Sequence, residues 1–240
     1  MHIPSRTRSL LLLCLPVSLL LLHCERDKEV ILPHTYEIFP QTEGLTRISL
    51  VADTTYTTAG IEAPDIDSYY KQEVQAGIEQ DLNGRNLRLV ELSRSELVLG
   101  TNYDFIPFRT ATHYLEPVAG TTYFGERIEN NQRVQVLKFP VHSAQRWNGN
   151  LYNNQNSEIF EYAQVDTTVT IRGHTYENCV MVLQKLDTAG VIRKEFAYEI
   201  YAPGIGLIKK YDRTLVFDQP DGGFNPSASR IYFEELIEAF

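Results

Sequence analysis

The sequence has few cysteines, few basic residues and no apolar segment long enough to span a membrane as a helix. Only 3 of the 240 residues are cysteine, which excludes a scaffold held together by disulfides. Lysine and arginine number 22 against 31 acidic residues, giving a formal net charge of −9. Nucleic-acid binding is disfavoured because phosphate recognition requires clustered Lys and Arg. The 14 glycines and 11 prolines exclude collagen-like and low-complexity chains.

Motifs of known catalytic and metal sites are also missing. The nucleophile elbow Gly-x-Ser-x-Gly does not occur, and the six histidines are dispersed without a pair at ligand spacing on one expected element. Cys179 lies in an apolar segment, where burial makes a thiol unreactive. Glu234 and Glu235 fall on opposite sides of an expected strand and so do not form an acid and base pair. We therefore expect no enzymatic activity, no metal ion and no cofactor.

The amino terminus has the pattern of an export signal. Arg6 and Arg8 precede the apolar run 10–22, which is shorter than the roughly 20 residues of a spanning helix and fits the core of a signal peptide. Cys24 follows after His23 and begins a charged segment, which resembles a bacterial lipoprotein box with an acylated cysteine. His23 departs from that pattern, which usually has Gly, Ala or Ser at this position. Alternatively, Cys24 merely ends a signal that is cleaved elsewhere, or the segment is an uncleaved anchor.

These features predict three parts: a lipoprotein-type signal over residues 1–23, a tether over 24–32 and a single β-rich domain over 33–240. Residues 1–23 contain two arginines and no acidic residue, so their removal changes the formal net charge from −9 to −11. An acidic body does not favour an anionic lipid surface, so membrane attachment would depend on the acyl chains of Cys24. Cys179 then remains as a lone thiol, and no intramolecular disulfide is expected.

The body of the chain shows the alternation of half-buried strands rather than the period of helices. Apolar and polar residues alternate over 165–171, and Gly173 then turns the chain. The apolar segment 179–183 predicts a central strand covered on both faces, and residues 187–190 predict a further hairpin turn. Residues 229–240 are expected to form a strand rather than a short helix.

Two asparagine-containing pairs, Asn83-Gly84 and Asn130-Asn131, are strong hairpin signals because the central residues of such turns need positive φ. A lone hairpin is only marginally stable, so we expect these ribbons to join into a larger sheet. The predicted fold class is mainly β: a curved antiparallel sheet, partial barrel or sandwich built from hairpins, with few helices.

A faint internal repeat is present. Phe39-Pro40 is echoed by Phe139-Pro140, and each pair is followed by a hairpin, turning at Gly84 or Gly173. The offsets between the matching positions differ. Because true repeats keep their period, chance is the simpler explanation.

Four segments resemble a family of predicted lipoproteins from Bacteroidota that carry a β-rich domain of unknown function. They are the start at Cys24 and the segments 36–40, 139–150 and 193–209. The last contains Tyr-Ala-Pro-Gly-Ile-Gly-Leu-Ile-Lys (201–209), in which Pro203 and Gly204 suit a type II turn and Gly206 suits a bulge or close approach. The resemblance implies an exported, membrane-tethered module without a transferable activity. The acidic residues at 25, 27 and 29 look like the signal that sends such lipoproteins to the outer membrane and cell surface.

Aromatic residues supply the candidate ligand contacts. Tyr69, Tyr70, Tyr123, Trp147, Tyr152 and Tyr162 present flat faces for stacking a sugar or lining a groove. Of these, we select Trp147, Tyr152 and Tyr162 as ligand contacts, although aromatic residues also pack sheets and Trp147 equally suits a core or corner anchor. Thr54, Thr167 and Thr188 lie in Asp-Thr-Thr or Asp-Thr-Ala tripeptides that resemble O-glycosylation acceptors of these bacteria.

Three functions remain open on the sequence alone. The first is a non-enzymatic binding or assembly module of the cell envelope, whose partner is an envelope protein, a glycan or a lipid. The second is a carrier of a lipid or other hydrophobic ligand, which predicts a continuous apolar lining inside a curved sheet. The third is an enzyme with an unrecognised site, since fold does not decide function.

Overall fold

The computed structural model describes residues 35–56, 64–97, 103–117, 123–218 and 223–240. They form one 12-stranded antiparallel sheet and a 3₁₀ helix, η1 (Thr35–Ile38). The first strands are β1 (Thr46–Thr55), β2 (Asp65–Gln80), β3 (Asn86–Glu96), β4 (Ile106–Pro117), β5 (Tyr123–Glu129) and β6 (Gln132–Phe139). The others are β7 (Arg146–Asn148), β8 (Ile159–Ile171), β9 (His174–Asp187), β10 (Arg193–Ala202), β11 (Gly206–Phe217) and β12 (Phe224–Ala239).

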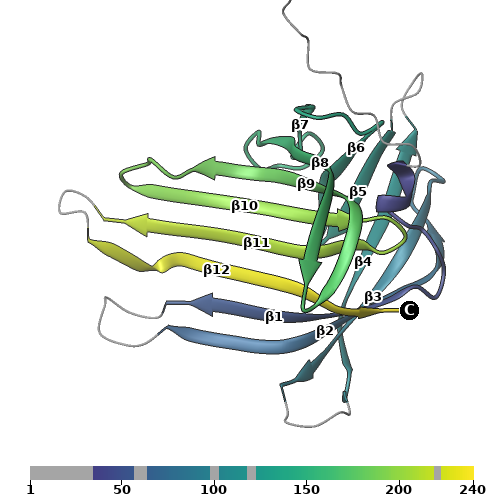
Figure 1. The fold of residues 1–240 in the computed structure, drawn as a ribbon, viewed down its shortest axis with the longest axis horizontal. Coiled ribbons are helices and arrows are strands. Elements are labelled where there is room, and N and C mark those ends of the chain that lie inside the picture. Colours follow the sequence, from purple (N-terminus) through teal and green to yellow (C-terminus); the bar gives the residue numbers. More distant parts are fainter. Residues whose placement is uncertain (1–34, 57–63, 98–102, 118–122, 219–222) are drawn as a thin grey trace, which may run out of the picture.

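The sheet consists of two meanders, β1–β6 and β7–β12, joined where β1 pairs with β12 (Figure 1). Within each meander every strand pairs with its neighbour in sequence. The sheet curves strongly but does not close on itself, so the expectation of a mainly β, curved antiparallel fold is confirmed. In the described part of the chain, no helix is both long and apolar enough to cross a membrane.

The predicted hairpins are present at their turn residues. Gly84 has a φ of 75° between β2 and β3, and Asn130 and Asn131 have φ values of 49° and 59° between β5 and β6. Gly173, with a φ of 85°, turns β8 into β9. The carboxyl-terminal segment is strand β12, as expected. These turns confirm the hairpin positions, but Asn83 does not have a positive φ, so the Asn83-Gly84 turn has one such residue rather than the expected two.

The two Phe-Pro pairs occupy related places in the meanders. Phe39-Pro40 precedes β1, and Phe139-Pro140 lies at the end of β6, just before β7. Gly84 and Gly173 link the second and third strands of their respective meanders. Both phenylalanine rings are buried in the same core cluster.

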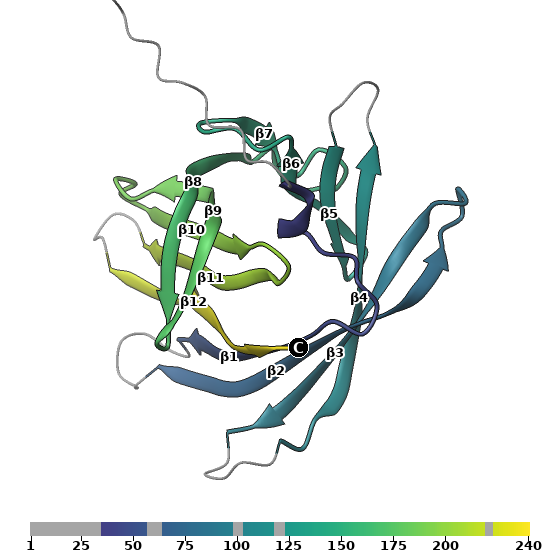
Figure 2. The ribbon, with the colours of Figure 1, turned by 45° about the vertical axis from the view of Figure 1, so that its right-hand side comes forward.

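The main core fills one end of the curve. Figure 2 looks into the sheet, with β8–β12 on one side, β4–β6 on the other and η1 between them. Ile38 and Phe39 pack there against residues of β6–β11 such as Phe160 and Tyr162. The indole N–H of Trp147 donates a hydrogen bond of 2.7 Å to the Gln135 carbonyl oxygen. This bond connects β7 to β6, the two outermost strands in the sheet order.

A second cluster forms where the tip of the β8–β9 hairpin packs on β10–β12. It contains Ile171 and Cys179 from the hairpin together with Ile200, Ile208 and Leu236. Burial raises the pKa of the Cys179 thiol to about 11. The thiol is fully buried, which confirms the expectation of a core residue.

The corner after β10 has the predicted conformation. Gly204 has a φ of 72° and Gly206 a φ of 88°. A Cβ atom at Gly206 would clash with the guanidinium group of Arg47 and contact Pro40. Glycine is therefore favoured at 206 by the positive φ and by a close approach, made by a side chain of β1 rather than by a second backbone.

Candidate functional site

A groove of about 460 Å³ lies within the curve of the sheet. Alternate residues of a strand point to the same face, so several strands each contribute two or more side chains to it. Most of the lining is charged: Asp53, Asp67, Lys71, Glu73, Arg94, Arg109, Arg127, Glu129, Lys210, Asp212, Arg230 and Glu234. Tyr69, Leu92, Phe108, Leu207 and Tyr232 complete the lining.

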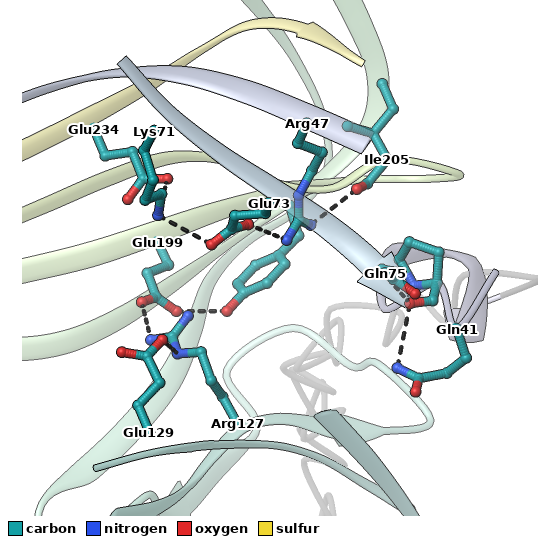
Figure 3. A network of polar contacts seen from close by, with 12 residues as sticks. Gln41, Arg47, Lys71, Glu73, Gln75, Arg127, Glu129, Glu199, Ile205 and Glu234 are labelled. Carbon is teal, nitrogen blue, oxygen red and sulfur yellow. Dashed lines mark hydrogen bonds and ion pairs between the residues drawn. The ribbon is translucent and has the colours of Figure 1, made fainter. Parts of the chain in front are cut away.

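Lys71 is the centre of a buried ion network on β1, β2 and β12 (Figure 3). Its ammonium nitrogen lies 2.5 Å from a Glu234 oxygen and 3.0 Å from a Glu73 oxygen. Arg47 also contacts Glu73 and donates a hydrogen bond of 3.0 Å to the Ile205 carbonyl oxygen. The attraction between these cations and carboxylates holds the inward-facing side chains of the three strands in place.

A second network connects opposite sides of the curve. Arg127 on β5 lies 2.7 Å from Glu199 on β10, although many strands separate the two in the sheet order (Figure 3). Glu199 is fully buried and also accepts a 2.5 Å hydrogen bond from the Tyr201 hydroxyl. Lys210 approaches the same carboxylate to 3.0 Å. Glu199 thus links β5 to β11 through β10.

Further ion pairs continue the groove toward solvent. Arg94 lies 3.1 Å from Asp67, and Arg230 lies 2.5 Å from Asp53. The Arg94 guanidinium also covers the Tyr69 ring at 4.2 Å. All the lysines and arginines that line the groove contact a carboxylate. The groove is therefore polar but nearly balanced in charge.

The buried pairs hold their charges at neutral pH. Burial alone lowers the pKa of Lys71, but the carboxylates of Glu234 and Glu73 reverse this and hold that pKa well above its usual value. Burial likewise raises the pKa of Glu199, and Arg127 and Lys210 more than offset the effect, so that pKa is lowered. The pKa of Glu73 is held well below its usual value by Lys71 and Arg47 against the same effect of burial.

His113 on β4 makes stability depend on pH. Burial and the nearby positive charge of Arg47 lower the pKa of His113 to about 3 from 6.5, with Glu73 acting in the opposite direction. Arg127 and Lys71 also face the ring and lower the pKa. The unfolded chain therefore takes up a proton as pH falls below 6.5, while the folded chain resists it down to about pH 3.

We predict that the free energy of unfolding falls by about 2 kcal/mol between pH 7 and pH 5 because of His113. The lowered carboxylate pKa values of Glu73 and Glu199 remove stability only at lower pH, below 4.5. Denaturant unfolding at both pH values measures the effect. A His113→Gln variant should lose most of this difference, and an unchanged slope would show that another group is responsible.

The ion pairs determine whether the side chains of the groove can hold a metal ion, act as an acid and base pair, or form hydrogen bonds with a ligand. In the described part of the chain, no group of three or more His, Cys, Asp and Glu side chains is arranged to hold a metal ion. Glu234 faces Lys71, whereas Glu235 contacts Lys209 at 3.2 Å and Arg172 at 3.4 Å. The two carboxylates therefore lie on opposite faces of β12, as predicted. The groove offers fixed hydrogen-bond donors and acceptors to a bound molecule.

The aromatic ligand contacts chosen from the sequence lie outside this groove. Trp147 and Tyr162 pack together, with ring centroids 4.8 Å apart, and are only 6% and 1% exposed. The Tyr162 hydroxyl donates a 2.8 Å hydrogen bond to the Lys138 carbonyl oxygen. Tyr152 is exposed and lies under the Arg133 guanidinium at 4.6 Å. The structure thus brings two of the three together, inside the core, where Trp147 has its alternative role as an anchor.

The modification candidates have different surroundings. Thr54 on β1 and Thr167 on β8 are half-buried, whereas Thr188 is exposed after β9. Cys24 lies outside the described residues, as do the predicted signal and tether. Among the other tyrosines considered, Tyr69 lines the groove, and Tyr123 packs against the main core.

The charged residues of the groove were not predicted from the sequence. The available signal was the alternation of charged and tyrosine side chains, as in Asp67, Tyr69, Lys71 and Glu73 on β2. The same alternation occurs in Arg230, Tyr232 and Glu234 on β12. Such a pattern is usually assigned to a solvated face, and only the curvature of the sheet turns it inward.

Comparison with known proteins gives limited similarity. No protein-family model matches the sequence, and no curated protein is similar to it. Among solved structures, the crystal structure of a candidate lipoprotein from Parabacteroides distasonis ATCC 8503 matches with a TM-score of 0.35 and 12% sequence identity. The match covers 85% of this chain and 98% of that chain. We therefore base the function on the residues of this chain.

Proposed function

We propose that the protein is an exported lipoprotein of the cell envelope that binds a polar ligand in its charged groove. Residues 1–23 act as the signal, Cys24 carries the acyl chains and residues 24–32 tether the β-rich domain of 33–240. The acidic residues after Cys24 support an outer-membrane location with exposure at the cell surface. The module is a non-enzymatic binding or assembly component.

The charged lining of the groove carries this proposal. An acyl chain placed there would separate Asp67, Arg94 and Arg230, which are still partly exposed, from water without offering hydrogen bonds, and uncompensated desolvation costs several kcal/mol per ion. A polar ligand replaces water by hydrogen bonds and leaves the ion pairs intact. The continuous apolar lining that a carrier of hydrophobic ligands requires is not formed by these residues. The groove therefore favours the binding module over the lipid carrier.

Fixed protonation states favour binding over catalysis. Glu73 and Glu199 have pKa values lowered by their cationic partners, so these carboxylates stay ionised at neutral pH. General acid and base catalysis works best when a pKa lies near the working pH. Cys179, the thiol of the described residues, is buried in the second cluster and away from the groove lining.

A thermal-shift experiment tests the groove. The full chain in detergent is heated with an aqueous extract or a chloroform extract of its own host cells. We expect the aqueous extract to raise the melting temperature, because a ligand that binds only the folded state stabilises it. Arg94→Gln should abolish this rise, and Arg146→Gln, which alters an exposed arginine paired with Glu161, should retain it. A rise with the chloroform extract alone would favour the carrier instead.

The anchor is tested separately by metabolic labelling with palmitate in the native host. We expect the label to enter the wild-type chain and to be absent from a Cys24→Ala variant, because the thiol is the acceptor. A Cys179→Ala variant is the matched control and should label normally. Equal labelling of the Cys24→Ala variant, or no labelling of the wild type, would contradict the proposed attachment.

A further inference from the structure

A second hollow, of about 430 Å³, lies on the face of β10 and β11 opposite the groove. Phe196, Tyr198, Tyr211 and Arg213 line it, together with Thr188 from the turn after β9. Lys210 and Asp212 line the groove, so strand alternation directs Tyr211 and Arg213 to the other side of the sheet. The two sites therefore share strands but not side chains.

Three aromatic rings form the wall of this hollow. The rings of Tyr198 and Tyr211 are stacked, with centroids 5.8 Å apart and an interplanar angle of 26°. Phe196 lies 5.6 Å from Tyr198 and 6.1 Å from Tyr211. Among the described residues, the hydroxyls of Tyr198 and Tyr211 have no hydrogen-bond partner. The hollow thus combines flat apolar faces with hydroxyl groups that are free to bind.

Arg213 differs from the other arginines that the structure describes. Each of the others contacts a carboxylate: Arg47, Arg85, Arg88, Arg94, Arg109, Arg127, Arg133, Arg146, Arg172, Arg193 and Arg230. Arg213 contacts none within the described ranges, and its buried Nε atom has no hydrogen-bond partner. An unpaired guanidinium is unexpected in a chain with a net charge of −9.

The neighbouring charges add to this local positive character. Lys194 lies on the same face of β10 as Phe196 and contacts the Phe217 ring at 5.4 Å. It has no carboxylate partner in the part of the chain that the structure describes. Glu195 and Asp212 are within 3.7 Å of Lys185, on the other face of the sheet. An anion at Arg213 therefore meets cations on this face.

We propose that this hollow binds an acidic saccharide, a sugar ring that carries a carboxylate. The planar guanidinium of Arg213 matches a carboxylate through two parallel hydrogen bonds. The C–H face of the sugar packs on the rings of Tyr198 and Tyr211, and the tyrosine hydroxyls bond to its hydroxyl groups. This site is independent of the ligand proposed for the groove.

Calorimetric titration of the full chain in detergent tests the proposal, with trigalacturonate and a glucuronate disaccharide as probes. We expect at least one probe to bind, and Arg213→Gln to weaken its binding at least tenfold. Tyr211→Ala should weaken it similarly. Arg146→Gln and Tyr103→Ala are matched controls, since Arg146 is exposed and Tyr103 belongs to another surface aromatic group, and both should bind within twofold of wild type.

Two further probes are titrated against the wild-type protein, so their results do not depend on the folding of a variant. The methyl ester of trigalacturonate has the same rings without charge, and wild-type protein should bind it at least tenfold more weakly. Soluble dihexanoyl phosphatidylglycerol tests an anionic lipid headgroup at the same site. Equal affinity for the methyl ester, tighter binding of the lipid, or no binding of either uronate would overturn the proposal.

Discussion

An Arg127→Met variant should lose about 3–5 kcal/mol of unfolding free energy, because the substitution leaves a buried carboxylate without its main partner. Glu199 is fully buried and lies 2.7 Å from Arg127. The remaining contacts of Glu199 with Lys210 and Tyr201 come from the same side of the curve. The variant therefore also removes the ion pair that connects β5 with β10. Denaturant unfolding followed by circular dichroism measures the loss.

A double variant separates the charge effect from packing. Adding Glu199→Gln to Arg127→Met removes the uncompensated charge and should recover a large part of the lost stability. Arg146→Met is the control for an exposed pair, since Arg146 is 65% exposed and lies 3.3 Å from Glu161. Its effect should stay within about 1 kcal/mol. Equal losses for Arg127→Met and Arg146→Met would contradict the assigned role of the buried pair.

A Trp147→Ala variant should lose about 3–5 kcal/mol, because it removes a large buried ring from the main core. Trp147 packs on Tyr162 and Phe160, with centroids 4.8 Å and 6.1 Å away. It also donates the hydrogen bond that connects β7 with the Gln135 carbonyl oxygen of β6. Thermal and denaturant unfolding both report the change.

Trp147→Phe divides this effect into its two causes. The smaller ring retains much of the packing but cannot donate the hydrogen bond, so we expect a loss of roughly 1–3 kcal/mol. Leu151→Ala is the control, because Leu151 is exposed and lies in the connection after β7. A Trp147→Ala loss no larger than that of Leu151→Ala would show that the indole is a surface group free for ligand contact.

The local parts of this fold are predictable from the sequence because turn chemistry is local. Gly84, Asn130-Asn131 and Gly173 each turn the chain where their tolerance of positive φ indicates. Residues 229–240 continue the alternation and form part of β12. A close approach of another part of the chain to Gly206 was expected, but its partner, the Arg47 side chain, was not.

The groove was not predictable in the same way, because it depends on pairing between distant strands. Lys71 and Glu234 meet only because β1 lies between β2 and β12 in the sheet. Arg127 and Glu199 meet only because the sheet curves. A single sequence contains the alternating charges but not the register that pairs them. Aromatic residues were chosen as ligand contacts instead, and two of them, Trp147 and Tyr162, belong to the core.

Native mass spectrometry of the protein released from its own host in mild detergent tests the polar groove most directly. We expect a bound molecule without acyl chains, retained by wild type and by Arg146→Gln but lost from Arg94→Gln. The mass of the chain itself, including the lipid that we propose for Cys24, serves as the reference. A fatty acid or phospholipid that stays bound to all three proteins would contradict the polar groove and favour a carrier of hydrophobic ligands.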